Sequence, residues 1–418
     1  MNILVIGSGG REHTICWALS KSPKVDKIYC LPGNGGISEI AECVPISVMD
    51  FDSIVEFVDS HKDIELTVVA PDDPLAGGLV DRLNEKGHRA FGPKANAAII
   101  EASKAFSKYL MKKYGIPTAN YEEFNDYENA KDYVSKAKYP LVVKADGLAL
   151  GKGVIICNNV DEGLKAVKEM MIDSKFKDAG KTVIVEEFMS GQEVSILSFC
   201  DGKTIVPMVN ARDHKRAYDN DEGLNTGGMG TFSPSAIYTP EIEKEVMNNI
   251  ILPTLDAMNR EGRTFKGVLY FGLMLTSDGV KVVEYNARFG DPETQVVLPR
   301  LKTDLADIFN AVVDGTLDKL NIEWSDEACV CVVMASGGYP ENYEKGKAIT
   351  IGDLDKDILL FHAGTKLQDG KLVTSGGRVL GVTALGKDIN EAREKAYANV
   401  EKISFDGAFY RKDIGIKK

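Results

Sequence analysis

Along the first hundred residues, short apolar runs alternate with segments in which apolar residues have helical spacing. The apolar runs are "NILVIG", "KIYCLPG", "ELTVVAP" and "HRAFGP", and the segments "EHTICWALSKS" and "LAGGLVDRLNEKG" lie between them. In the first of these segments Ile15 and Leu19 are four positions apart, as on one face of a helix. This alternation predicts a parallel sheet with helices on its faces, whose ligands bind at the carboxyl ends of the strands. We expect a substrate-binding α/β domain over residues 1–101.

From Tyr139 to Asn286 the pattern changes to strand pairs joined by tight turns. The run "YPLVVKA" is expected to pair with "GVIIC" across a glycine-rich loop. Two later strand pairs are joined at Asp201-Gly202 and Asp278-Gly279, and glycine accepts the positive φ that such hairpin turns require. Repeated hairpins favour an antiparallel sheet, so this stretch is predicted to form a separate α+β domain.

The last part of the chain is predicted to be a third, small domain of antiparallel strands and one helix. The stretch "DGTLDKLNIEWSDEA" is typical of a linker, which we place at 294–325, followed by the C-terminal domain at 326–418. Asp388 and Glu391 have the spacing of a capping box at the start of an amphipathic helix. The face of this helix that is expected to be buried carries Ile389, Ala392, Ala396 and Val400.

The amino-acid composition of the chain argues against several classes of protein. The 418 residues are enough for about two to four domains. The net charge of -12 argues against a nucleic-acid surface, because duplex binding depends on Lys and Arg that neutralise phosphates. The seven cysteines are unpatterned and the five histidines lack metal-ligand spacing, which favours reduced thiols and disfavours zinc. No apolar run is long enough to span a bilayer, so we expect a cytoplasmic protein without a membrane or nucleic-acid partner.

The glycine-rich stretch "KADGLALGKGV", Lys144 to Val154, is close to a P-loop but does not match it. Only three residues separate Gly147 from Gly151, and Gly153 stands where the magnesium-binding hydroxyl should be. A flexible surface hairpin is one interpretation. The other is a phosphate cover, because Lys144 at the end of an apolar strand needs an anionic partner and glycines let backbone amides approach phosphate oxygens.

Two glycine-rich turns, "GSGG" and "PGNGG", end neighbouring predicted strands. The first belongs to "GSGGREH", but Glu12 replaces the third glycine of a dinucleotide fingerprint, and no acid follows the second strand to hold a ribose. A plain strand-to-helix turn is the alternative. We favour a site where backbone amides at a helix N-terminus hold one phosphate of a small substrate.

The stretch "VVEYNARFGDPETQ" carries the most specific chemistry. Residues two apart on a strand share a face, so Glu284, Asn286 and Arg288 should project together. A carboxylate beside an amide oxygen suits magnesium, and Arg288 is a fork-shaped donor for phosphate or carboxylate. A solvated polar face is the alternative. The nearby glycine cluster "NTGGMG" and the charged "RDHKR" could complete one polar pocket.

Taken together, these motifs resemble the ATP-grasp ligases and, more closely, the phosphoribosylamine–glycine ligase (glycinamide ribonucleotide synthetase) family. The motifs "GSGGREH", "FGP", "SKAFSK", "DGLALGKGV", "DHKR", "NTGGMG" and "RFGDPETQ" follow in this order across nearly the whole chain. The resemblance implies an ATP-grasp domain at 102–293, with a lid at roughly 117–190. The glycine-rich stretch then corresponds to the flap that closes over the ATP phosphates.

The resemblance also implies roles for particular residues. Lys104 and Lys144 would contact the ATP phosphates under the flap, and the "VEEF" segment would be the hinge that binds adenine. Glu284 and Asn286 match the ligands of Mg²⁺ or Mn²⁺. The residues expected to bind the nucleotide are Lys104, Lys144, Gly151, Lys152, Gly153, Glu186, Glu187, Phe188 and Glu193.

For the other substrates, glycine and 5-phosphoribosylamine, the resemblance implies a site at the glycine turns. The expected substrate-binding residues are Gly9, Gly10, Gly33, Asn34, Asp213, Gly228, Arg288 and Asp291, and the expected catalytic residues are Arg288, Asp213 and Lys144. The implied reaction is ATP-dependent ligation through glycyl phosphate in purine biosynthesis, by a monomer or weak homodimer. Many ATP-grasp enzymes carry a further metal-binding acid on the preceding strand, where this chain has Gly272.

Three alternatives remain at this stage. Another ATP-grasp enzyme of purine synthesis would share the ATP site but use bicarbonate or formate. An NAD-dependent oxidoreductase would depend on "GSGGRE", which lacks the third glycine and the ribose acid. A nucleotide-sensing module without turnover would have no need of Lys144, Glu284 and Arg288 together.

Overall fold

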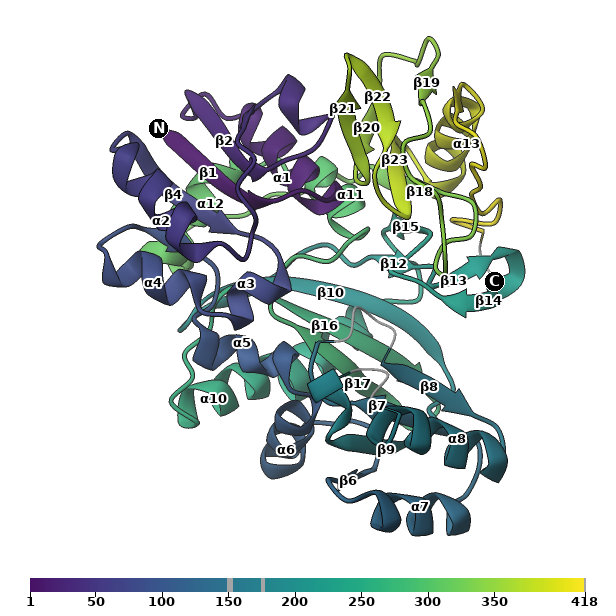
Figure 1. Cartoon of the computed structure of the whole chain (residues 1–418). Helices are drawn as coiled ribbons and strands as arrows, with labels where there is room; N and C mark the ends of the chain where they lie inside the picture. The colour runs from purple at the N-terminus through teal and green to yellow at the C-terminus, as the bar shows by residue number, and fades with distance from the viewer. Residues whose placement is uncertain (149–152, 174–176, 417–418) are drawn as a thin grey trace.

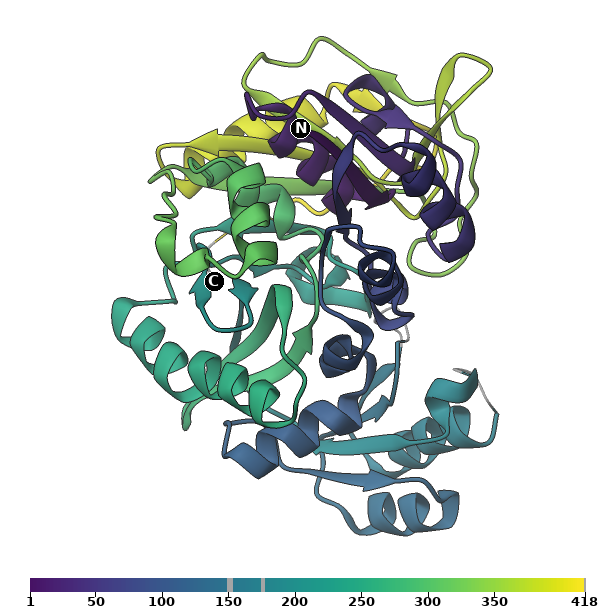
Figure 2. The same cartoon turned by 90° about the vertical axis from the view of Figure 1, so that its left-hand side faces the viewer.

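The computed structural model describes residues 1–148, 153–173 and 177–416. Its N-terminal and C-terminal regions lie side by side, and a central antiparallel sheet lies beneath both of them (Figure 1). A small lid of strands and two helices extends from the central region at the opposite end of the molecule, as the rotated view shows (Figure 2). The three regions and the lid correspond to the predicted fold class.

The N-terminal region is a five-stranded parallel sheet, as predicted. Its strands lie in the order β3-β2-β1-β4-β5, with bounds β1 (Asn2–Gly7), β2 (Lys27–Pro32), β3 (Glu42–Cys43), β4 (Ile64–Val69) and β5 (Ala90–Phe91). Its helices are α1 (Gly10–Ser20), α2 (Phe51–Ser60), α3 (Asp72–Ala76), α4 (Leu79–Glu85) and α5 (Ala95–Ala102). The segment predicted as one helix from Leu75 is two helices, because Gly78 adopts a left-handed φ of 86° between them.

The central region is a four-stranded antiparallel sheet in the order β11-β10-β16-β17. The strands are β10 (Gln192–Asp201), β11 (Ile205–Pro207), β16 (Lys266–Thr276) and β17 (Gly279–Asn286). Both predicted hairpin turns are present, with φ of 95° at Gly202 and 101° at Gly279. Three helices pack with this sheet and share its core: α6 (Lys104–Tyr114), α9 (Pro240–Val246) and α10 (Leu252–Arg260).

The lid is a second antiparallel sheet with its own core. Its strands lie in the order β6-β9-β7-β8, with bounds β6 (Tyr121–Phe124), β7 (Leu141–Ala145), β8 (Val154–Cys157) and β9 (Val183–Glu187). Helices α7 (Tyr127–Lys136) and α8 (Val160–Met171) cover it. The predicted hairpin of β7 with β8 is confirmed, and Lys144 pairs with Val154 at the end next to the connecting loop.

The C-terminal sheet draws two strands from earlier in the chain. Its order is β12-β15-β18-β23-β20, with bounds β12 (Arg212–Asp213), β15 (Gly230–Ser233), β18 (Ala328–Ala335), β20 (Ile358–His362) and β23 (Arg378–Gly386). Helix α13 (Ile389–Val400) packs on this sheet, and the Asp388 carboxylate accepts from Glu391 N as the capping pattern predicts. Both β12 and β15 belong to the predicted ATP-grasp domain, which ends at residue 293. Since β12 carries Asp213, the C-terminal sheet holds part of the predicted site.

The segment predicted as a linker at 294–325 is folded. It forms α11 (Thr294–Val297) and α12 (Leu305–Asp314), and α12 lies beside the N-terminal sheet (Figure 1). Phe309 of α12 is fully buried, and its ring centroid lies 4.1 Å from that of Phe91 in β5, with the two rings tilted by 35°. The amphipathic pattern of "LADIFNAVVD" was the signal for this helix, and its apolar face fastens the N-terminal sheet to the central one.

The remaining elements are short. Two-stranded sheets pair β13 (Arg216–Tyr218) with β14 (Glu222–Asn225), β19 (Thr350–Ile351) with β24 (Ile403–Ser404), and β21 (Thr365–Gln368) with β22 (Lys371–Thr374). A π-helical turn at Met247–Ile251 joins α9 to α10. In the part of the chain that the structure describes, there is no helix with the length and hydropathy needed to cross a membrane.

Two buried histidines lie where the N-terminal and C-terminal regions meet. The Nδ1 of His13 accepts from the backbone N–H of His362 at 2.8 Å, and the two rings are 5.5 Å apart. Burial lowers the pKa of His13 to about 3, with a further contribution from His362, and burial lowers the pKa of His362 to about 4. Both imidazoles are therefore neutral in the folded protein.

The free energy of unfolding is expected to fall as the pH drops from about 6.5 to about 4. In this window the unfolded chain binds protons at these histidines and the folded chain does not, so stability rises with pH by roughly 1 kcal/mol per unit for each group. Urea unfolding at a series of pH values measures the slope. His13→Gln keeps an acceptor for His362 N and should flatten it; an unchanged slope in that variant would contradict the assignment.

Candidate active site

The two glycine-rich turns of the N-terminal region meet at the carboxyl ends of β1 and β2. Gly33 has a φ of 73°, and its N–H donates to Gly7 O at 3.1 Å. At the start of α1, Gly9 N donates to the buried Glu12 carboxylate at 2.6 Å. The two amides thus have acceptors inside the protein, and the contact of these turns with a substrate stays a prediction.

Gly10 and Asn34 tie these turns to the rest of the molecule. A Cβ at Gly10 would lie 2.5 Å from Gln295 Nε2, so the glycine permits close approach of α11. The Asn34 amide donates to Ser8 O and to His362 O, at 2.8 Å each. Asn34 therefore holds the N-terminal region to the C-terminal region, and Gly10 lets α11 pack closely on the N-terminal region.

Arg288 lies between the end of β17 and the N-terminal region. Its guanidinium is 2.8 Å from Glu101, 3.9 Å from Asp72 and 3.3 Å from the side-chain oxygen of Asn286. Burial would lower the pKa of Arg288, but Glu101 and Asp72 raise it above its usual value. Glu101 is itself buried and also accepts from Ala287 N at 2.7 Å.

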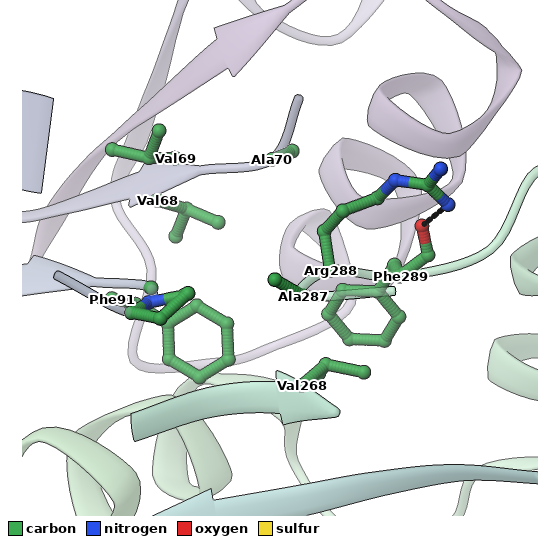
Figure 3. Close-up of a pocket in the computed structure, with 10 residues that line it drawn as sticks. Val68, Val69, Ala70, Phe91, Val268, Ala287, Arg288 and Phe289 are labelled. Carbon is green, nitrogen blue, oxygen red and sulfur yellow. Dashed lines mark hydrogen bonds between the residues drawn. The ribbon is translucent and has the colours of Figure 1, made fainter. Parts of the chain in front are cut away.

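A cavity of about 10 Å³ lies beside Arg288, between the ends of β4 and β5 and the chain that follows β17 (Figure 3). Its walls are apolar and include Val68, Phe91 and Val268. The Arg288 side chain turns away from these walls, and its guanidinium donates to Phe289 O at 3.2 Å (Figure 3). This volume holds about one water molecule, so it is no substrate pocket.

Glu284 and Asn286 lie together at the end of β17, as the strand pattern predicted. The Glu284 carboxylate is 3.5 Å from Lys215 Nζ, which is also 3.2 Å from Glu193. Burial alone would raise the pKa of Glu284, but Lys215, Lys144, Lys104 and Arg288 lower it. An ionised carboxylate and an amide oxygen suit a hard divalent cation.

The side chains around Glu284 limit how many protein ligands a metal ion could have there. Among the described residues, no three His, Cys, Asp or Glu side chains are placed as a ligand set. A metal at Glu284 and Asn286 would therefore take its other ligands from phosphate and water, as Mg²⁺ commonly does. The four cationic side chains around Glu284 also fit a polyphosphate.

At the hinge between the lid and the central region, one buried carboxylate joins two lysines. Glu186 on β9 is 2.9 Å from Lys144 Nζ and 3.0 Å from Lys108 Nζ, and all three residues are buried. Burial lowers the pKa of Lys108 to about 8, against the attraction of Glu186. Lys144 also donates to Val283 O at 3.3 Å, so it connects the lid to the strand that carries Glu284.

The remaining predicted hinge and flap residues surround this carboxylate. Lys104 donates to Gly147 O at 2.8 Å, and burial lowers its pKa. Glu187 accepts from both N–H groups of Asn120, and Phe188 is 41% exposed, so the hinge leaves an aromatic face open to a ligand. Gly153 O accepts from Ala145 N at 2.8 Å, whereas Gly151 and Lys152 lie outside the described residues.

Asp213 and Gly228 face each other beside Pro292. Asp213 Oδ1 is buried and has no hydrogen-bond partner among the described residues. Burial, followed by the charge of Glu293, raises the pKa of Asp213 well above its usual value. Gly228 has a φ of 113°, and a Cβ there would lie 2.6 Å from Asp213 Oδ1. Only glycine therefore lets this loop approach the carboxylate.

Asp291 joins all three regions of the molecule. Its carboxylate accepts from Arg11 N at 3.3 Å and from Gln295 Nε2 at 3.0 Å, and it is 3.4 Å from Arg378. Arg378 also donates to Gly227 O at 2.6 Å and to Asp291 O at 2.8 Å. Burial would raise the pKa of Asp291, but Arg378 and Arg11 lower it.

Three family models for phosphoribosylglycinamide synthetase match the chain in sequence. They are the N domain at residues 1–101, the ATP-grasp (A) domain at 102–294 and the C domain at 329–417. The chain belongs to the phosphoribosylglycinamide synthetase family.

Individual members of the phosphoribosylglycinamide synthetase family are similar to this chain along its full length. A phosphoribosylamine–glycine ligase from Halalkalibacterium halodurans is 50% identical and covers 100% of this chain and 97% of the relative. One from Caldanaerobacter subterraneus is 49% identical, covering 99% of each. The crystal structure of a phosphoribosylamine–glycine ligase from Thermotoga maritima has a TM-score of 0.86 and 36% identity, covering 99% of this chain and 100% of that one.

The fold is shared more widely than the sequence. The biotin carboxylase domain of a Hydrogenobacter thermophilus 2-oxoglutarate carboxylase, solved with MgADP, has a TM-score of 0.74 at 15% identity, covering 98% of this chain and 91% of that one. Such a likeness shows the architecture alone. The expected resemblance to ATP-grasp ligases is confirmed, and the chain is an ATP-dependent ligase of the phosphoribosylglycinamide synthetase family rather than an oxidoreductase or a sensing module.

Gly272 of β16 pairs with Glu284 of β17, at the position where the resemblance led us to look for a further metal-binding acid. A Cβ at Gly272 would lie 3.1 Å from Glu284 Cγ, closer than most packed side chains. In this member of the phosphoribosylglycinamide synthetase family the glycine therefore leaves room for the Glu284 side chain. It supplies no ligand of its own.

Several residues of the site were missed in the sequence. Lys215 was visible in "RDHKR" but had no assigned partner, and Lys108 follows Lys104 by one helical turn in "SKAFSK". Glu101 and Arg378 gave no local signal, because their partners are far away in the chain. The apolar run before Lys144 did indicate a buried lysine, and a search for a second lysine on the same helix face as Lys104 could have found Lys108.

Proposed function

We propose that this chain joins glycine to 5-phosphoribosylamine at the expense of ATP, giving glycinamide ribonucleotide, ADP and phosphate. The observation that carries the proposal is the series of charged side chains between the hinge and the N-terminal region that act on Glu284. It runs from Glu186 and Lys144 through Glu284 with Lys215 to Arg288. Family membership supports the same reaction.

We assign the nucleotide to the hinge between the lid and the central region. The backbone of Glu186 to Phe188 would bind adenine, and Glu193 the ribose. Lys104 and Lys144 would bind the phosphates, with the flap at Gly151, Lys152 and Gly153 over them. These roles rest on the motifs, and the buried position of Lys144 next to Glu186 supports them because its charge is held in a fixed place.

Glu284 and Asn286 would hold Mg²⁺ or Mn²⁺. A divalent cation bound there would neutralise the developing charge on the transferred phosphoryl group. The depressed pKa of Glu284 supports the assignment, since the carboxylate is ionised and is held beside Lys215 at 3.5 Å.

Glycine and 5-phosphoribosylamine are assigned to the space between Asp213, Arg288 and Asp291. The buried, unpartnered Oδ1 of Asp213 is an acceptor that needs a donor, and the ammonium of glycine has that chemistry. The glycine turns at Gly9, Gly10, Gly33 and Asn34, together with Gly228, would border the phosphoribosyl group.

The chemistry requires no protein nucleophile. A carboxylate oxygen of glycine attacks the γ-phosphorus of ATP, ADP leaves, and glycyl phosphate results. The amine of 5-phosphoribosylamine then attacks the acyl carbon, phosphate leaves, and the amine loses one proton. The residues of the chain bind, orient and neutralise charge, which is the main source of catalysis in phosphoryl transfer.

In the test, ADP and glycinamide ribonucleotide are expected in equal amounts only when ATP, metal, glycine and 5-phosphoribosylamine are all present. The measurement is ADP release by a coupled assay, with product identified by mass. Bicarbonate and formate in place of glycine serve as controls, because they are the donors of the alternative ATP-grasp enzymes. Comparable turnover with either of them would overturn the assignment of glycine.

The predicted domain limits and assembly state are part of the same proposal. We place the domains at 1–101, 102–293 and 326–418, joined through the folded segment 294–325. The lid would cover roughly 117–190. We expect a monomer or weak homodimer that acts in the cytoplasm, and analytical ultracentrifugation over a range of concentrations measures the assembly state.

A further inference from the structure

The hairpin β13–β14 is held to the rest of the molecule in an unusual way. Within the described residues it is a sheet of two strands only, and such a hairpin is marginally stable on its own. A cavity of about 520 Å³ lies between it and the loops at Gly337–Gly338 and Gly407–Tyr410. On this side the hairpin has an aromatic contact of Tyr218 with Phe409, whose ring centroids are 5.9 Å apart, and polar contacts supply the rest of its attachment.

Arg411, near the end of the chain, supplies the main contact. Its side chain is only 1% exposed although it carries a charge. Its Nε and Nη2 each donate to the Asp413 carboxylate at 2.7 Å, which is a two-pronged ion pair. Nη1 donates to Arg216 O at 3.1 Å, and Nη2 is 3.0 Å from Asp221. One guanidinium thus holds both the start and the tip of the hairpin.

Two backbone contacts reinforce this attachment. Lys412 N donates to Asp219 Oδ1 at 2.7 Å, and Asn220 N donates to Asp413 Oδ2 at 2.9 Å. At the tip, Asn220 and Asp221 have left-handed φ values of 60° and 59°, which are uncommon for residues other than glycine. The bonds from the C-terminal segment offset the cost of this conformation.

The hairpin leads directly to the charged centre of the site. Lys215 is the residue before Arg216, and its carbonyl accepts from Thr226 N at 2.7 Å, which closes the base of the hairpin. Its Nζ lies between Glu193 and Glu284, at 3.2 Å and 3.5 Å. The backbone at Arg216, which Arg411 binds, is therefore one residue away from the lysine that contacts both carboxylates.

We propose that Arg411 and Asp413 form a C-terminal latch that positions Lys215 between Glu193 and Glu284. The inference rests on the proposed function, because it treats those carboxylates as nucleotide and metal ligands. Arg411 touches no reactant and acts through the hairpin, so it is a positioning residue. The C-terminal segment is in this sense part of the active site.

A double-mutant cycle tests the latch. Arg411→Met and Lys215→Met are each expected to lower kcat about tenfold or more, since small displacements of charged groups cost this much. Because the first change acts through the second residue, the double variant should be no slower than Lys215→Met alone. Effects that multiply independently would overturn the proposal. So would a normal kcat in Arg411→Met with only a lowered melting temperature.

Two further variants keep the result interpretable. Lys402→Met breaks an ion pair of 2.8 Å with Asp355 in the same region, away from the hairpin, and should leave kcat unchanged. If Arg411→Met does not fold, Asp221→Asn replaces it in the cycle, because it weakens the ion pair of 3.0 Å between Arg411 and the tip of the hairpin, and the Asp221 side chain is 54% exposed. A wild-type kcat in Asp221→Asn would then decide against the latch.

Failure of the latch and failure of the proposed function are separable. Turnover of the unaltered protein with glycine and 5-phosphoribosylamine tests the function by itself. The same cycle is also measured as affinity for MgATP by calorimetry, which needs neither substrate. The latch is supported if Arg411→Met weakens MgATP binding in the otherwise unaltered protein but has no further effect when added to Lys215→Met, whatever the acyl donor is. The latch is contradicted if Arg411→Met weakens binding equally in both proteins.

Discussion

Glu284→Ala is expected to lower turnover at least 100-fold while leaving the melting temperature nearly unchanged. The fall corresponds to about 3 kcal/mol in the barrier, comparable with losing one preorganised electrostatic group. Stability should be kept because β17 packs through Val280, Val282 and Tyr285, whereas the Glu284 side chain is 39% exposed. Lys215 also keeps Glu193 as a partner in the variant, so no charge is left alone.

Metal dependence separates a ligand from a merely nearby carboxylate. The Glu284→Ala variant should need a higher magnesium concentration than the unaltered protein for the same fraction of its own maximal rate. Glu245→Ala is the matched control, because that carboxylate accepts from Val280 N at 3.0 Å at the other end of the strand. It should cost stability and little turnover. Near-normal turnover of Glu284→Ala at low magnesium would show that Glu284 is no ligand.

Arg288→Met is expected to lower both stability and turnover, for two different reasons. The buried Glu101 carboxylate loses the partner that lies at 2.8 Å, and an unpaired buried charge costs about 3 kcal/mol or more. Burial already raises the pKa of Glu101, so in the variant this group would be protonated over a wider range of pH. Turnover falls because the predicted contact with substrate is lost.

The double variant Arg288→Met/Glu101→Gln distinguishes these two effects. The glutamine removes the unpaired charge and still offers an oxygen to Ala287 N, which donates to Glu101 at 2.7 Å. Stability should therefore recover, and turnover should not. Chemical denaturation and the ADP-release assay measure the two quantities. Recovery of turnover together with stability would mean that Arg288 supports the fold only.

Local patterns in the sequence were sufficient for the elements of the fold and for part of the site. Apolar runs alternating with helical segments predicted the parallel sheet, and the Asp-Gly turns predicted the central hairpins, because these signals depend on neighbouring residues. The period of two along a strand placed Glu284 beside Asn286. The segment 294–325 was assigned as a linker because its amphipathic helix was overlooked, although the pattern in "LADIFNAVVD" was present.

The order of motifs along the chain was sufficient to predict the family. The tertiary structure decided which groups the residues of these motifs contact. Glu101, Arg378 and Arg411 reach the site from segments that are distant in sequence, and only the packing of three regions brings them to Arg288, Asp291 and Arg216. Packing also decided that β12 joins the C-terminal sheet. The type of a residue determines which bonds it can form. Which groups it contacts depends on burial and on distant chain segments, and no local pattern contains that information.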